Sequence, residues 1–139
     1  MSTEQTGTQS EHRTAGRGVV RGHVVAAVTL LRERIAEPWT DGALADEVHL
    51  SRSHLFRCFD ATVGMSPLAY LRQMRVQKMA QLLLGTDLSI AEVARAVGWK
   101  DPSYATRCFH AAYGVSPTAY RHQHAPVLDT LTVSPSPEK

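Results

Sequence analysis

The stretch that decides the fold is residues 89–121, SIAEVARAVGWKDPSYATRCFHAAYGVSPTAYR. Much of it repeats an earlier segment, because residues 53–70 and 103–120 share the same residue at ten of eighteen positions when shifted by fifty. In the residues before these segments the shift is forty-nine, which pairs Ala45 with Ala94. The turn of the second copy is therefore one residue longer than the turn of the first. Each copy reads as short helix, tight turn and capped helix, which is typical of a helix-turn-helix unit. A helical solenoid is the weaker alternative, because such arrays need about three copies.

Capping residues predict seven helices joined by short turns, so the expected fold class is all-α, with two helix-turn-helix subdomains joined by a long linker helix. Pro38 should end a first helix of about residues 20–36, and Gly85 should end the fourth in a left-handed conformation. The other six helices are expected to begin at Thr40 or Asp41, Ser51, Ser66 before Pro67, Ser89 in a capping box with Glu92, Asp101 before Pro102, and Ser116 before Pro117.

The ends of the chain have a different composition from its middle. Residues 1–18 are polar, and residues 125–139 contain the sequence SPSP, so both are expected to be flexible, as an N-terminal arm and a C-terminal tail. The predicted organisation between them is a first subdomain over 19–65, a linker helix over 66–85 and a second subdomain over 86–124. The N-terminus lacks the apolar core of a secretory signal, which predicts a soluble, cytoplasmic protein with no membrane partner.

Each capped helix after a turn is predicted to have a buried and an outward face. The first has Leu55, Cys58, Phe59 and Thr62 inward, which leaves Arg52, Ser53, Phe56, Arg57 and Asp60 outward. The second has Ala105, Cys108, Phe109 and Ala112 inward, which leaves Pro102, Ser103, Thr106, Arg107 and His110 outward, with Tyr104 at the boundary. An outward Phe can contact a thymine methyl group, and Arg can bind guanine or phosphate, so these faces are typical of DNA recognition.

The linker helix sets the expected spacing of the two units. Eighteen helical residues span about 27 Å, close to the roughly 34 Å between successive major grooves on one side of B-DNA. We therefore expect a monomer to bind an asymmetric site with its two recognition helices in successive grooves. Arg72, Arg75 and Lys78 on the same helix are candidates for phosphate contacts, and solubility is an equal alternative. The net charge of +2 is compatible with DNA binding and decides nothing.

Residues 89–121 also resemble the signature of AraC/XylS-type bacterial regulators, and the resemblance extends over about residues 40–122. It implies a transcription regulator, more often an activator, that binds double-stranded promoter DNA and contacts RNA polymerase near the bacterial nucleoid. By this resemblance the DNA-binding candidates are Arg52, Ser53, Phe56, Arg57, Pro102, Ser103, Tyr104, Thr106 and Arg107. Most members carry a separate effector-binding domain, so the chain is either a stand-alone regulator or a fragment of a larger one.

The sequence departs from the family pattern at two positions in the second unit. Ala105 stands where the pattern has Phe, at a cost of up to a few kcal/mol unless Trp99 fills part of the space. Pro102 removes a hydrogen-bonding side chain from a usual base-reading position. We therefore expect the first unit to carry most of the specificity and the second to anchor and orient.

Other functional classes are disfavoured by the same residues. Cys58 and Cys108, beside His54 and His110, belong to separate units and cannot form one four-ligand site, so neither a metal nor another cofactor is expected. The carboxylates Asp46, Glu47, Asp87 and Glu92 occupy capping or solvated positions without a nucleophile, so an enzyme is not expected. The competing class is a protein-interaction module that uses the exposed Phe56.

Overall fold

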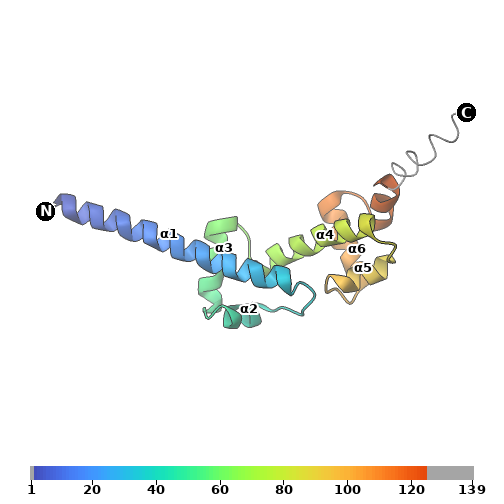
Figure 1. The fold of residues 1–139 in the computed structure, drawn as a ribbon, viewed down its shortest axis with the longest axis horizontal. Helices are drawn as coiled ribbons and strands as arrows, with labels where there is room; N and C mark the ends of the chain where they lie inside the picture. The colour runs from blue at the N-terminus through green and yellow to red at the C-terminus, as the bar shows by residue number, and fades with distance from the viewer. Residues whose placement is uncertain (1, 125–139) are drawn as a thin grey trace, which may run out of the picture. The chain divides into compact units, whose positions relative to one another are not determined.

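The computed structural model describes residues 2–124, with side chains from residue 17 onward, and every regular element in that range is helical. The helices are α1 (Ser2–Glu33), α2 (Asp41–Glu47), α3 (Arg52–Val63), α4 (Pro67–Gly85), α5 (Ile90–Ala96) and α6 (Pro102–Tyr113), and residues 117–124 are also helical (Figure 1). The all-α prediction is confirmed. The predicted tail, residues 125–139, lies outside the described residues.

The first helix differs from its predicted bounds at both ends. α1 begins at Ser2 rather than near residue 20, and it ends at Glu33. The segment contains no proline before Pro38, so nothing in it stops a helix from propagating toward the N-terminus. Each added residue then gains a hydrogen bond once the helix is nucleated. The polar composition of this segment did not predict its helical backbone.

The chain forms two compact units. The first contains α1 to Arg34, then residues from Trp39 through α2 and α3 to Leu71, and the second contains residues 35–38 and everything from Arg72. The core of the first unit is built by α1, α2 and α3, and α1 packs against α3 (Figure 1). Its buried apolar side chains are Val24, Ala27, Leu31, Leu44, Ala45, Leu55, Cys58, Phe59 and Leu71.

The core of the second unit draws on the helix that the sequence treats as a linker. Val76, Met79, Ala80 and Leu83 of α4 pack in one apolar cluster with side chains of α5 and α6. The carboxyl-terminal part of residues 66–85 is therefore a structural helix of the second unit. Ala105 and Trp99 lie in the same cluster, and Ala105 is fully buried. This placement supports the expectation that Trp99 compensates for the small side chain.

The helix caps follow the predictions closely, with one exception. Thr40, Ser51, Ser89 and Asp101 each accept a first-turn backbone N–H, and Ser89 with Glu92 forms the predicted capping box. Ser66 and Ser116 also accept first-turn amides, those of Ala69 and Ala119. The exception is Gly85, because the glycines with positive φ are Gly64, Gly98 and Gly114. The end of α4 is closed instead by Arg121, which donates to the carbonyl oxygens of Leu83 and Thr86 at 2.9 and 3.2 Å.

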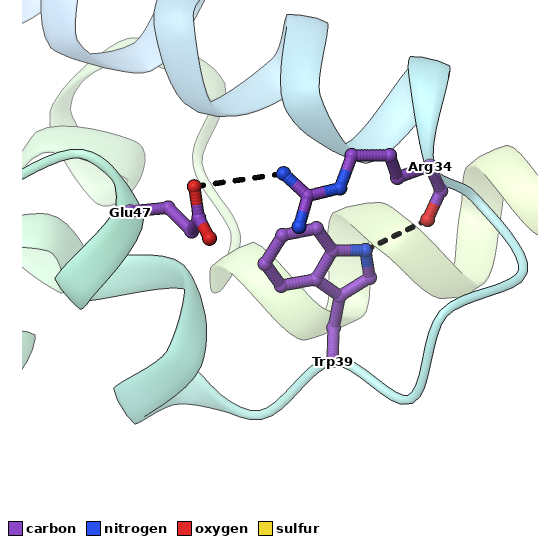
Figure 2. Close-up of polar contacts among 3 residues, drawn as sticks. All are labelled: Arg34, Trp39 and Glu47. Carbon is purple, nitrogen blue, oxygen red and sulfur yellow. Dashed lines mark hydrogen bonds and ion pairs between the residues drawn. The ribbon is translucent and has the colours of Figure 1, made fainter.

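Within the first unit, the residues on either side of the loop after α1, Arg34 and Trp39, contact each other, and Arg34 also contacts Glu47 (Figure 2). The indole N–H of Trp39 donates to the Arg34 carbonyl oxygen at 2.9 Å, and the Arg34 guanidinium lies 5.0 Å from the Trp39 ring centroid. Arg34 also reaches Glu47 of α2 at 3.5 Å. This ion pair is partly exposed and contributes little by itself, about 0–1 kcal/mol. The indole hydrogen bond and the arginine–ring contact also hold the chain entering α2.

Candidate nucleic-acid interface

The two turns are built alike, as the repeat predicts. In the first, the Leu50 N–H donates to the Ala45 carbonyl oxygen at 2.9 Å; in the second, Trp99 N–H donates to Ala94 at the same distance. Each turn contains one residue with positive φ, His49 at 60° and Gly98 at 104°. Ala45 and Ala94 are both buried, and α2 packs against α3 as α5 packs against α6. The structure therefore contains two helix-turn-helix units, α2 with α3 and α5 with α6.

The outward face of α3 holds the four residues expected to bind DNA from this unit. Arg52, Ser53 and Arg57 are exposed, and Phe56 is 39% exposed despite its apolar ring. The opposite face buries Leu55, Cys58 and Phe59, as the helical period predicts. The N-terminus of α3 is capped by the neutral Ser51, so the partial positive charge of its first turn is retained there. Positive, hydrogen-bonding and apolar groups thus share one solvent-facing surface.

The outward face of α6 is less uniform. Ser103, Tyr104 and Arg107 are exposed, whereas Pro102 and Thr106 are half-buried. The Asp101 carboxylate caps the helix by accepting the Ser103 N–H at 2.9 Å. A negative cap opposes the attraction of this helix terminus for phosphate, as the sequence predicts. The guanidinium of Arg107 lies over the Tyr104 ring, 5.6 Å from its centroid.

Two residues predicted to face inward do not. Thr62 and Ala112 are exposed, although they continue the spacing of the buried Phe59 and Phe109. Both lie in the last turn of their helix, just before the left-handed glycines Gly64 and Gly114. There the helix leaves the core, so periodicity alone overestimates how far the buried face extends.

Arg75 has a role that neither sequence interpretation anticipated. Arg72 and Lys78 are exposed, but Arg75 is only 8% exposed and donates to the carbonyl oxygens of Ile35 and Glu37 at 3.0 and 2.7 Å. It is therefore neither a phosphate contact nor a solubilising charge. Burial lowers the pKa of its guanidinium, which remains charged because arginine starts from a very high value. Its partners lie about forty positions away, and no local pattern marks them.

Other candidate chemistry stays separate from the two outward faces. Burial raises the pKa of the Cys58 thiol, with the positive charge of Arg57 opposing the shift, so this cysteine behaves as a core side chain. Cys108 is half-buried on α6. Glu92, considered as a possible acid or base, accepts the Ser89 N–H at 2.8 Å in the capping box. None of the helices in the described range combines the length and apolar character needed to span a bilayer.

Comparison with known proteins places this geometry in a family. A model of a helix-turn-helix domain family matches residues 44–123, more than half of the chain. The chain belongs to the AraC/XylS family. Among curated relatives, a putative AraC-like transcription regulator of Streptomyces lividans is 39% identical over 80 residues, covering 58% of this chain and 26% of that protein. The lactose operon transcription activator of Staphylococcus xylosus is 33% identical over 84 residues, covering 60% of this chain and 30% of that protein.

Solved structures of AraC-type domains agree with the fold. The C-terminal domain of AraT, a response regulator from Geobacillus stearothermophilus, has a TM-score of 0.71 at 31% identity and covers 73% of this chain and 85% of that chain. The DNA-binding domain of AdpA, solved in complex with a target DNA, has a TM-score of 0.70 at 31% identity. The match covers 72% of this chain and 90% of the AdpA chain. The AraC/XylS family and fold are those of DNA-binding transcription regulators rather than enzymes.

Proposed function

We propose that this AraC/XylS chain binds double-stranded promoter DNA in a sequence-specific manner and activates transcription, with the outward faces of α3 and α6 as its DNA-contacting surfaces. The observation that carries the proposal is the α3 face, where Arg52, Phe56 and Arg57 are exposed beside a neutrally capped helix start. Solvent gives no reason for an exposed Phe, whereas a major groove offers thymine methyl groups and guanine acceptors. The DNA-binding candidates remain the nine residues that the family resemblance implies, of which Pro102 and Thr106 are half-buried.

The mode of binding belongs to the same proposal. A monomer inserts its two recognition helices into successive major grooves of an asymmetric site, and RNA polymerase is the expected protein partner. Support for activation comes from relatives such as the Staphylococcus xylosus activator. A footprint with two protected segments about one helical turn, roughly 10 base pairs, apart would agree with this mode. A footprint confined to one groove segment would contradict it.

The test begins with selection of bound duplexes from a random pool, followed by anisotropy titrations over a salt series. We expect log Kd to rise linearly with log salt, because phosphate contacts release counterions. Arg57→Ala and Arg107→Ala should each weaken binding, by about 1–3 kcal/mol with relaxed specificity at one base pair if the side chain binds guanine. A phosphate contact would instead weaken all sequences and reduce the salt slope. Arg32→Ala and Arg95→Ala, exposed arginines elsewhere in the same two units, are the matched controls.

The exposed Phe56 also favours a second candidate, a protein-interaction module that uses the same helical surface. The salt series separates the two functions. A pure interaction module should show essentially no salt-dependent binding to any duplex, and Arg57→Ala and Arg107→Ala should then leave the DNA titration unchanged.

A further inference from the structure

The ring of Tyr104, on α6, contacts the side chains of Arg107 and Trp99. It is 38% exposed, with the Arg107 guanidinium carbon 5.6 Å from its centroid one helical turn further on. The Trp99 ring also meets it edge-on, with centroids 5.8 Å apart and planes at 84°. Both arrangements are within the range in which cation–π and aromatic contacts are attractive.

Trp99 is held in place by the core of the second unit. Its ring is buried in the apolar cluster, and its backbone N–H closes the turn after α5. The buried Arg75 guanidinium lies 5.8 Å from the Trp99 centroid and is itself fixed by the carbonyl oxygens of Ile35 and Glu37. The four side chains therefore form one series, Arg75, Trp99, Tyr104 and Arg107, that runs from a buried, hydrogen-bonded arginine to an exposed one.

The repeat does not reproduce this series in the first unit. A shift of fifty residues pairs Tyr104 with His54 and Arg107 with Arg57. The His54 ring instead meets His23 of α1 edge-on, with centroids 5.6 Å apart. The residue of the first unit that corresponds to Tyr104 therefore packs against a histidine of α1, whereas Tyr104 packs against Trp99.

We propose that Tyr104 is a positioning residue for Arg107: its ring, held by Trp99, fixes the Arg107 guanidinium in the orientation in which it binds DNA, and its hydroxyl is not itself a base-reading group. This role rests on the proposed function. A free arginine loses substantial rotamer entropy on binding, and a side chain already ordered against a ring loses less. A guanidinium held through its flat face keeps its N–H donors available for guanine or phosphate.

The test compares Tyr104→Phe, which keeps the ring, with Tyr104→Leu, which removes it, each alone and combined with Arg107→Ala. Titration against the selected duplex should show Tyr104→Leu weakened about two- to fivefold relative to Tyr104→Phe, the range for an exposed cation–π contact. In the Arg107→Ala background, Tyr104→Leu should cause no further loss. Thermal melting by circular dichroism checks that each variant is folded.

A second readout requires no DNA. The side-chain protons of Arg107 should show upfield ring-current shifts in wild type and Tyr104→Phe, and these shifts should disappear in Tyr104→Leu. Equal losses of affinity in Tyr104→Phe and Tyr104→Leu would show that the hydroxyl binds DNA directly and would overturn the proposal. The proposal would also be overturned if Tyr104→Leu weakened DNA binding equally in the wild-type and Arg107→Ala backgrounds. It would likewise be overturned if the Arg107 protons of the wild type showed no ring-current shifts. If the wild-type chain binds no duplex, the proposed function fails, while the shifts still report whether the ring holds Arg107.

Discussion

Arg75 and Ile35 lie forty residues apart in the chain, and the Arg75 Nε–H donates to the Ile35 carbonyl oxygen at 3.0 Å. The same guanidinium donates to Glu37 at 2.7 Å, so one buried side chain satisfies two carbonyls in the segment that follows α1. Hydrogen bonds to a charged group contribute about 1.5–3 kcal/mol each, more than neutral ones. Arg75 is therefore a principal polar anchor of the second unit.

Replacement of Arg75 by Met should destabilise the second unit by about 2–4 kcal/mol, because two backbone acceptors lose their donor. Urea denaturation in a Trp39→Phe background measures this, since the fluorescence then reports Trp99 in that unit. The control is Arg72→Met, an exposed position on the same helix, where the change should stay within about 0.5 kcal/mol. Equal effects of the two substitutions would refute the anchoring role.

Gly98→Ala should be more damaging than Gly114→Ala, although both glycines have positive φ in the same unit. A Cβ on Gly98 would lie 2.7 Å from an Arg75 nitrogen and 2.8 Å from the Ala36 Cα, whereas one on Gly114 would meet nothing within 4 Å. We expect a loss of about 1 kcal/mol at Gly114 from backbone strain and about 2–4 kcal/mol at Gly98. Thermal or urea unfolding decides the order, and similar losses would show that both Arg75 and the Ala36 backbone move aside without cost.

Substitution of Phe56 and Arg57 should change the DNA sequence that the chain prefers more than substitution of Thr106 and Arg107. The α3 face has a neutral cap and fully outward residues, whereas α6 has the Asp101 cap and the half-buried Pro102 and Thr106. Repeated selection from a random duplex pool with each variant gives the comparison. If the α6 variant changes the selected sequence more, the second unit carries the specificity and the ranking is wrong.

The capping box should make stability depend on pH at the acid end. Backbone and side-chain hydrogen bonds from Ser89 lower the pKa of Glu92, with a smaller contribution from Arg95 and with desolvation opposing them. Because the folded pKa lies below the unfolded one, the stabilisation is present above the unfolded value, near 4.3. It is lost as pH falls through the folded value. The stability difference between wild type and Glu92→Gln should therefore shrink below about pH 4, and a difference that grows there would contradict this assignment.

The two cysteines should react at different rates. Cys58 is buried and its pKa is raised by that burial, while Cys108 is half-buried. With a disulfide reagent at pH 8, the Cys108→Ala variant, which retains Cys58, should react at least about tenfold more slowly than Cys58→Ala. Both should react at similar rates in urea. Equal rates in the folded state would place Cys58 in an open environment.

Sequence alone determined the features whose chemistry is local. N-caps such as Ser51 and the Ser89–Glu92 box accept amides two or three residues away, and the buried and outward faces of α3 and α6 follow from the helical period. The repeat then identified both helix-turn-helix units, because similar local signals form similar turns. These signals act within one or two helical turns, so the residues that produce them are visible in a short stretch of sequence.

Tertiary structure decided what depends on partners far away along the chain. The burial of Arg75, the closure of α4 by Arg121 rather than by Gly85, and the exposure of Thr62 each depend on where another segment packs. An arginine is equally compatible with a solvated helix face and with a buried bond to a distant carbonyl, since both use the same side chain. Only the folded backbone brings the Ile35 and Leu83 carbonyls to those arginines, and only then do the two roles differ.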